Sequence, residues 1–372
     1  MIAPIFGSAY PDLTLARTVR DLAWRNLQLA ESLSAMRKNN FDIVRLVLAA
    51  IVVFVHCYDL SLAPRLVFFV HYLNAHIAVE GFFAISGFLI FASYDRCTSI
   101  WEYTQNRAWR ILPGYWLSTL FCLAIAFSMH SFHVGRFLIA NLTFANFLQP
   151  NIPGVFTDNP GNDAMNGALW TIKIELMFYV AVPFIAWVCR RINRDVVLWS
   201  LFALSVLFRT VFASHEKIAI QLPGQLSFFM IGAIVYYHLA WFKRHGLWLM
   251  AGAAACYGVH LYTDWFFLRP LAIAGLTMGA CHLLPHFEGP TKFGDFSYGT
   301  YILHYPIIQL AVAAGFFNFH PWIALAGTVL VVAGTALLSW FFVEKPSLTH
   351  SKSRRLRQAA LHQAANYPAA LP

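Results

Sequence analysis

The chain has 372 residues, of which 59% are hydrophobic, 16% aromatic and 12% charged, and its formal net charge is +9. Soluble domains carry about 25% charged residues, so this composition excludes an ordinary soluble enzyme, and the high hydrophobicity excludes a disordered chain. A mean hydropathy of +0.58 predicts an all-α, polytopic transmembrane bundle, with room for about ten spans of about 20 residues. The net charge then indicates Lys and Arg in cytoplasmic loops, and no nucleic-acid partner is expected.

The N-terminal segment, residues 1–41, is polar and basic, so no cleavable signal peptide is expected. Apolar residues recur there every three or four positions over 12–36, which predicts an amphipathic helix on the cytoplasmic membrane surface. Residues 42–346 are expected to form the transmembrane domain, and residues 347–372 a basic cytoplasmic tail that contacts lipid.

Apolar runs that are long enough to cross a bilayer are separated by charged or turn residues. They lie at about 43–60, 77–94, 111–129, 168–189, 196–213, 222–241, 247–262, 268–285, 296–316 and 322–343. An even number of spans places both termini on one side, and this arrangement gathers most of the 26 Lys and Arg residues there. The positive-inside rule identifies that side as the cytoplasm.

One further apolar run, at about 137–149, does not fit this charge distribution as a span, because it would move the later arginine-rich loops outside. We therefore expect an interfacial or re-entrant segment. The loop 151–167 that follows is rich in Asn, Asp, Gly and Pro and is expected on the outer face. It is either a contact for an exported acceptor or a plain connector, and the two interpretations have equal weight.

Ionisable residues inside a membrane are costly, so each is a candidate functional residue. Arg45 and His56 lie eleven residues apart in the first predicted span, so a helix turns both to one face, about 16 Å apart along its axis. Asp42, one turn before Arg45, shares this face and is expected to orient the guanidinium. A histidine suits proton abstraction near neutral pH and an arginine suits a phosphate or carboxylate, although a lone buried histidine is usually a core residue.

Ser86 and Gly87 form a pair of small residues in a wall of Phe and Ile, which permits close approach of another helix. Ala84 stands where a hydrolase nucleophile elbow has glycine, so a serine nucleophile is not indicated. Arg107 and Arg110 follow, three residues apart and on one helix face at the membrane surface. They are either a clamp for a phosphorylated ligand or a topology signal, and the spacing alone favours the second.

Glu175 lies some two turns inside the predicted span 168–189 and needs a buried partner, such as a cation from another helix or an acceptor hydroxyl. Lys173 is close enough to the interface to extend its ammonium group to water. The six cysteines and the pairs of histidines show no metal-ligand spacing with an acidic third ligand, so no metal is expected.

In this order, these residues resemble the acyltransferase-3 family of integral membrane O-acyltransferases, which modify cell-surface carbohydrates. The resemblance extends from Asp42 to about Pro346. The matching motifs are Arg45-x10-His56, Phe82-Phe83-x2-Ser86-Gly87-Phe88, Arg107-x2-Arg110 followed by Ile-Leu-Pro-x-Tyr-Trp, Leu169-Trp170-x4-Glu175-x2-Phe178-Tyr179, Ser297-Tyr298-x2-Tyr301-x2-His304 and Glu344-Lys345-Pro346. Lys173 departs from the family pattern, which has an uncharged residue there, and His304 matches it without a derived role, so core packing is the default interpretation.

The resemblance implies transfer of an acyl group, usually acetyl, from cytoplasmic acyl-coenzyme A (acetyl-CoA) to a sugar hydroxyl of a lipid-linked or growing glycan at the cell (inner) membrane. It implies that His56 is the general base and that Arg107 and Arg110 contact coenzyme A. The candidate site residues are His56, Arg45, Asp42 and Glu175 for catalysis, and Arg107, Arg110 and Ser86 for binding of the donor.

Two other functions remain open on the sequence alone. A transporter or flippase of a glycolipid or small metabolite also needs intramembrane Arg, His and Glu, although the chain has no internal repeat. The second open function is that of a permease-like protein, which would pass acyl groups to a separate extracytoplasmic transferase. The acceptor could be O-antigen, exopolysaccharide, a lipid-linked oligosaccharide or a small glycolipid, and the sequence does not distinguish them.

Overall fold

The computed structural model describes residues 39–287 and 289–350, which form helices and loops without a β-strand. The predicted all-α fold is therefore confirmed. The predicted amphipathic helix at 12–36 and nearly all of the basic tail lie outside the described residues. The chain divides after Asn40, and the description below concerns the unit that begins at Phe41.

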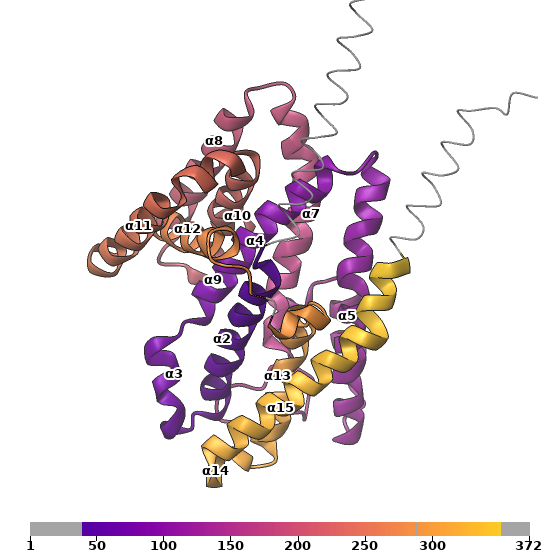
Figure 1. Cartoon of the computed structure of the whole chain (residues 1–372). Coiled ribbons are helices and arrows are strands. Elements are labelled where there is room, and N and C mark those ends of the chain that lie inside the picture. The colour runs from indigo at the N-terminus through magenta and orange to yellow at the C-terminus, as the bar shows by residue number, and fades with distance from the viewer. Residues whose placement is uncertain (1–38, 288, 351–372) are drawn as a thin grey trace, which may run out of the picture. The chain divides into compact units, whose positions relative to one another are not determined.

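The long helices follow the predicted apolar runs, because a helix satisfies its own backbone hydrogen bonds where water is absent. The long helices are α2 (Phe41–Ser61), α4 (Ala75–Asp95), α5 (Ile100–Ser128), α7 (Trp170–Cys189), α8 (Arg194–Val211), α10 (Leu222–Tyr237), α11 (Leu239–Thr263), α12 (Leu268–His282), α13 (Ser297–Ala313) and α15 (Pro321–Ser339) (Figure 1). The short elements are η1 (Pro64–Leu66), α3 (Val67–Tyr72), α6 (Gly135–Leu142), η2 (Asn146–Leu148), η3 (Gly167–Leu169), α9 (Glu216–Ala219), η4 (Pro290–Phe293), α14 (Phe316–Phe319) and the π-helical η5 (Trp340–Glu344).

Five of the described helices are long and apolar enough to cross a membrane, namely α2, α4, α5, α7 with η3, and α15 with its extension to His350. The pair α10 and α11 qualifies together but bends by 117° at its break, as a broken span or a re-entrant loop would. α12 and α13 have only 15 and 17 residues. The protein is thus a multi-pass membrane protein, and the number of about ten spans and the side of the termini stay predictions.

One segment differs in detail from the predicted runs, and another agrees with the position expected for it. α5 begins at Ile100, so most of the expected cytoplasmic loop 95–110 is helical. Ser99 caps this helix by accepting a hydrogen bond from the backbone N–H of Glu102 at 3.1 Å, and no glycine or proline interrupts the first ten residues. α6 has eight residues, far fewer than the roughly 20 needed to span, which fits an interfacial or re-entrant position for 137–149.

α4 and α10 approach each other closely through two glycines. A Cβ atom added at Gly87 would lie 1.9 Å from the carbonyl oxygen of Phe229, and one added at Gly232 would lie 1.9 Å from that of Ala84. Each glycine therefore faces the backbone of the other helix, and any side chain would push the helices apart. The predicted packing role of the Ser86–Gly87 pair is confirmed at Gly87.

α13 lies between α2 and α5 in the view of Figure 1 and packs against both. Tyr298, near its start, donates a hydrogen bond to the carbonyl of Ile111 at 2.8 Å, and further along Ser118 donates to the carbonyl of Ile302 at 3.0 Å. The contacts advance in the same order along both helices, so α5 and α13 are parallel. The start of α13 therefore lies beside Ile111 of α5, next to Arg110.

The polar loop 151–167 is attached to the C-terminal half of α13. Tyr305 donates a hydrogen bond to the side-chain oxygen of Asn162 at 2.8 Å. Gln309 donates to the carbonyls of Asn162 and Ala164 at 2.8 and 2.9 Å. Part of the polar composition of the loop thus serves to hold it against the bundle, which leaves its contact with an acceptor a prediction.

The orientation in the membrane can be tested across α7. Thr157 and Arg191 are both exposed and lie beyond opposite ends of this helix, whose 20 residues extend about 30 Å. We expect a cysteine at Thr157 to react with an impermeant thiol reagent in intact spheroplasts, in a background whose partly exposed native cysteines are serine. The matched cysteine at Arg191 should react only after permeabilisation. The reverse pattern would refute the orientation derived from charge.

Candidate active site

A cavity of about 340 Å³ lies between α2, α4, α5, α7 and the residues that start α13. Four arginines and three carboxylates are among the residues that line it, so its formal charge is slightly positive. We call it the arginine cavity. All the predicted site residues except His56 line it, namely Asp42, Arg45, Ser86, Arg107, Arg110 and Glu175. Residues that are separated by up to 133 positions in the sequence therefore lie around one cavity. Such clustering is expected, because ionisable groups are costly inside a membrane unless they face a cavity or one another.

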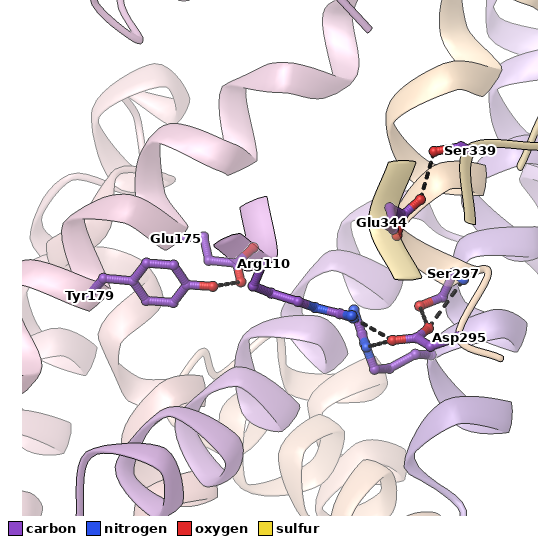
Figure 2. A network of polar contacts seen from close by, with 8 residues as sticks. Arg110, Glu175, Tyr179, Asp295, Ser297, Ser339 and Glu344 are labelled. Carbon is purple, nitrogen blue, oxygen red and sulfur yellow. Dashed lines mark hydrogen bonds and ion pairs between the residues drawn. The ribbon is translucent and has the colours of Figure 1, made fainter. Parts of the chain in front are cut away.

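Arg45 and Arg110 meet at a single carboxylate. Nη1 of Arg45 and Nη2 of Arg110 both donate to Oδ2 of Asp295. Figure 2 shows the contact from Arg110 and the hydrogen bond that Ser297 donates to Oδ1 of the same group. Burial by itself raises the pKa of Asp295, but the two guanidinium groups outweigh burial and hold this pKa well below its ordinary value. Asp295 thus remains ionised and joins α2, α5 and the start of α13 at one point.

Asp295 is a site residue that the sequence reasoning misses. The carboxylate bound to Arg45 is Asp295, whereas the helical spacing predicts Asp42, whose side chain is exposed and lines the cavity. Arg45 and Asp295 are 250 positions apart, a separation at which no helical periodicity applies. The one local signal is that Asp295 stands two residues before Ser297, where a matching motif begins.

Arg107 and Arg110 line the same cavity but have different partners. Arg110 is bound to Asp295, whereas Arg107 donates to the hydroxyl of Ser93 at 3.0 Å and lies 5.6 Å from the ring centre of Tyr179. The Nε of Arg107 is buried and has no hydrogen-bond partner in the described part of the chain. The charge of Arg107 is therefore not neutralised by a bound carboxylate, which suits an anionic ligand.

Glu175 has its partner on its own helix. It accepts a hydrogen bond from the hydroxyl of Tyr179, one turn further along α7, at 2.6 Å (Figure 2). Lys173, the residue that departs from the family pattern, donates to the side chain of Gln221 at 2.6 Å and does not line the arginine cavity. The lysine and the glutamate are thus bound to separate partners, and Glu175 is held at the cavity wall.

His56 lines a second cavity, of about 270 Å³, which we call the histidine cavity. Its Nδ1 lies 2.8 Å from Nε2 of His304, and the two rings are nearly parallel, with 9° between their planes. The other polar or aromatic side chains of this cavity are Asp59, Asn74, His76, Trp170 and Tyr301. His304 is therefore more than a packing residue, because it directly contacts the predicted base.

Arg45 and His56 share a face of α2, as their spacing predicts. Both reach residues in or next to α13, Arg45 at Asp295 and His56 at His304. Arg45 precedes His56 along α2, and its partner Asp295 likewise precedes His304 along the chain that enters α13. The two helices α2 and α13 therefore run parallel. The arginine pair and the histidine pair thus stand at two levels of one helix interface, about 16 Å apart along α2.

The arginine and histidine cavities are neighbours. Val79 and Tyr301 line both of them, so the two spaces adjoin at these side chains. The hydroxyl of Tyr301 lies 2.9 Å from that of Thr171, which lines the arginine cavity. One side of this wall offers positive charge and the other offers an imidazole. Within residues 39–287 and 289–350, no group of three His, Cys, Asp or Glu side chains could hold a metal ion.

The fold and site are those of a multi-pass membrane protein with charged and titratable groups at two adjoining internal cavities. The acyltransferase domain that defines the acyltransferase-3 family matches residues 38–344, and the chain belongs to this family. The match includes both cavities and every site residue named in this subsection. The resemblance seen in the motifs is thereby confirmed, and the protein is a membrane acyltransferase.

Curated relatives match almost from end to end. The chain is 28% identical to nodulation protein 10 of Rhizobium leguminosarum bv. viciae over 88% of its own length and 98% of the relative. It is 27% identical to an O-acetyl transferase of Shigella phage Sf6, with coverages of 86% and 99%. It is 26% identical to the exopolysaccharide production protein ExoZ of Rhizobium meliloti, with coverages of 79% and 96%. No solved structure shows a significant match.

Proposed function

We propose that the protein transfers an acyl group, acetyl in the first instance, from cytoplasmic acyl-coenzyme A to a hydroxyl of a cell-surface or lipid-linked carbohydrate. The observation that carries the proposal is the pair of adjoining cavities, one lined by arginines and the other by His56, with Val79 and Tyr301 between them. A donor bound on one side and an acceptor bound on the other would meet at this wall. The cell (inner) membrane is the proposed location.

The arginine cavity is the proposed donor site. Coenzyme A carries phosphates, and Arg107 has a guanidinium group without a bound carboxylate to receive them. Arg45 and Arg110 are already bound to Asp295, so we assign them to the positive wall of the cavity. Ser86 also lines the cavity, and we assign it to a contact with the acyl-bearing arm of the donor.

The histidine cavity is the proposed acceptor site. Asp59, Asn74 and His76 supply hydrogen-bonding groups and Trp170 supplies an aromatic surface, a mixture that suits a sugar with several hydroxyls. The name of the phage relative, an O-acetyl transferase, and that of ExoZ, an exopolysaccharide production protein, support a carbohydrate hydroxyl as acceptor. Loop 151–167 is a candidate for further contacts with the glycan on the outer face.

In the proposed reaction, His56 removes the proton of the acceptor hydroxyl while the oxygen attacks the thioester carbonyl. The carbon–oxygen bond forms, the carbon–sulfur bond breaks, and the coenzyme A thiolate leaves. The proton held by His56 then passes to the thiolate, so no net charge remains on the protein. A hydroxyl is a poor nucleophile near neutral pH, and general-base help of this kind gives about 10²- to 10⁴-fold acceleration.

The proposal is tested with purified protein in liposomes that contain radiolabelled acetyl-coenzyme A, with surface glycan or glycolipid as acceptor. We expect label in the glycan only with active protein, and mass spectrometry of surface glycans from cells with and without the protein should show the same acyl group. Movement of an unacylated glycolipid across the membrane, without label transfer, would support the transporter. Label released outside without glycan transfer would support an acyl permease that serves a separate transferase.

The donor site gives a direct prediction for Arg107. Changing Arg107 to Ala should raise the apparent KM for the acyl-coenzyme A donor by about 10-fold or more, because a hydrogen bond to a charged group contributes about 1.5–3 kcal/mol. Arg107→Lys should restore only part of the affinity, since a point charge does not reproduce a planar fork. Donor titrations of transferase activity measure both effects, and Arg191→Ala, on the opposite end of α7 from Glu175, is the control. Unchanged donor affinity in Arg107→Ala would reduce the motif to a topology signal.

A further inference from the structure

We propose that His304 is a positioning residue that fixes the tautomer of His56, so that Nε2 of His56 is the unprotonated nitrogen that serves as base. This inference rests on the proposed function and adds a residue to its machinery. It is carried by the hydrogen-bond chain that runs from the backbone of α13 through His304 to His56.

The first link of the chain is at Nδ1 of His304. This atom lies 2.7 Å from the carbonyl oxygen of Tyr301 and 3.2 Å from that of Thr300, both in the preceding turn of α13. A carbonyl oxygen only accepts hydrogen bonds, so Nδ1 of His304 must carry a proton. In the neutral ring, Nε2 of His304 then has a lone pair and accepts.

The second link follows from the first. Nδ1 of His56 lies 2.8 Å from this accepting Nε2, so Nδ1 of His56 must be the donor. A neutral imidazole has one protonated nitrogen, which leaves Nε2 of His56 without a proton. Since Nδ1 of His56 is taken up by His304, Nε2 is the ring nitrogen that remains for a ligand in the histidine cavity.

The surroundings hold this arrangement in place. His304 is completely buried, and its Nδ1 contacts are to its own helix, so its ring orientation is set by α13 itself. The ring of Tyr305 stands edge-on to His56, with 5.3 Å between ring centres. Reversing the tautomers would leave Nδ1 of His304 facing two carbonyl oxygens without a proton, an unpaired arrangement that buried polar groups avoid.

The same chain supports the reaction step. When Nε2 of His56 takes the acceptor proton, Nδ1 keeps its own proton and still donates to His304. The new positive charge is then stabilised through this bond by a ring whose other end donates to two backbone carbonyls. A hydrogen bond from a charged donor is stronger than one from a neutral donor, so the contact is worth more in the reacting state than in the resting state.

The test compares His304→Leu with His304→Gln in purified enzyme. Leu cannot accept a hydrogen bond from Nδ1 of His56, so turnover should fall by about 10- to 100-fold, while the KM values for donor and acceptor stay within about two-fold. This loss of turnover is smaller than the roughly 10⁴-fold loss that follows when an anionic orienting partner is replaced. Gln can accept through its side-chain oxygen and donate to the α13 carbonyls through its amide. His304→Gln should therefore recover at least ten-fold over His304→Leu.

Two controls separate positioning from general packing. His260 is a matched buried histidine in α11, whose Nδ1 lies 3.2 Å from the carbonyl oxygen of Trp265, and His260→Leu should leave turnover unchanged. In a His56→Ala background, His304→Leu should cause no further loss, because a positioning residue acts only through the base. Thermal unfolding midpoints in detergent and donor binding identify any variant that fails to fold. If His304→Leu does not fold, the comparison is made between His304→Gln and the wild type.

The outcomes distinguish this inference from the proposed function. If His56→Ala is inactive and both His304 variants turn over normally, the inference is overturned and the proposed function stands. If folded His304→Gln is as impaired as His304→Leu, acceptance of the His56 proton is not the role of His304, and the inference is again overturned. Normal turnover in His56→Ala would refute the proposed base itself.

Discussion

His56→Ala is expected to lose about 10²- to 10⁴-fold of its transferase turnover, the range that a general base contributes. His56 lines the histidine cavity and not the arginine cavity, so the affinity for the acyl-coenzyme A donor should be unchanged. The measurement is label transfer from acetyl-coenzyme A to glycan by purified protein, together with direct donor binding. Loss of both would indicate misfolding, and loss of turnover alone is the predicted result.

The control for this variant is His260→Ala, which removes another buried imidazole from a distant helix. It should show wild-type turnover. A His56→Ala protein with normal turnover would contradict the mechanism. The next candidate base would then be Glu175, which lines the arginine cavity with its carboxylate bound by Tyr179. The absence of any label transfer in the wild type would favour the transporter instead.

Much of the fold follows from composition, because an apolar run of sufficient length can only be a helix in lipid. Each predicted run coincides with a long helix, and α6 is short where the charge distribution argues against a span. The early start of α5 at Ile100 is not predicted by hydropathy, since its first turns are polar and are stabilised by the cap at Ser99. The number of spans depends on α8, α10, α11, α12 and α13, none of which qualifies by itself as a membrane span.

The sequence predicts which residues belong to the candidate site, but it does not predict which side chains bind each other. The cost of charge in a membrane selects Arg45, Glu175 and His56, and the motif order adds Arg107 and Arg110. Their actual partners Asp295 and His304 lie 250 and 248 positions from Arg45 and His56. Helical periodicity relates residues within a few turns, so it cannot reach across to α13. That periodicity points instead to Asp42, a residue on the right face of α2 but not the one that binds Arg45.

The second large expected effect is a loss of stability when Asp295, the shared partner of Arg45 and Arg110, is replaced. The side chains of Arg45 and Arg110 are 16% and 19% exposed, and that of Asp295 is 10% exposed. Asp295→Ala would leave two mostly buried guanidinium groups without their shared carboxylate. Removing one partner of a buried ion pair costs about 3–5 kcal/mol, because the remaining charge is desolvated and uncompensated. We expect a loss of this size in the free energy of unfolding, measured by denaturation in mild detergent.

The matched control is Asp195, whose contact with Nε2 of His238 at 2.8 Å is exposed, at 46% and 38% for the two side chains. Asp195→Ala should cost no more than about 1 kcal/mol, since exposed pairs contribute little. Asp295→Asn should resemble Asp295→Ala, because the amide keeps the shape of the side chain but cannot neutralise two arginines, whereas Asp295→Glu should retain part of the stability. Equal stability of Asp295→Ala and Asp195→Ala would mean that water or lipid headgroups already compensate Arg45 and Arg110. The junction of α2, α5 and α13 would then depend on apolar packing and on the bond from Tyr298 to Ile111.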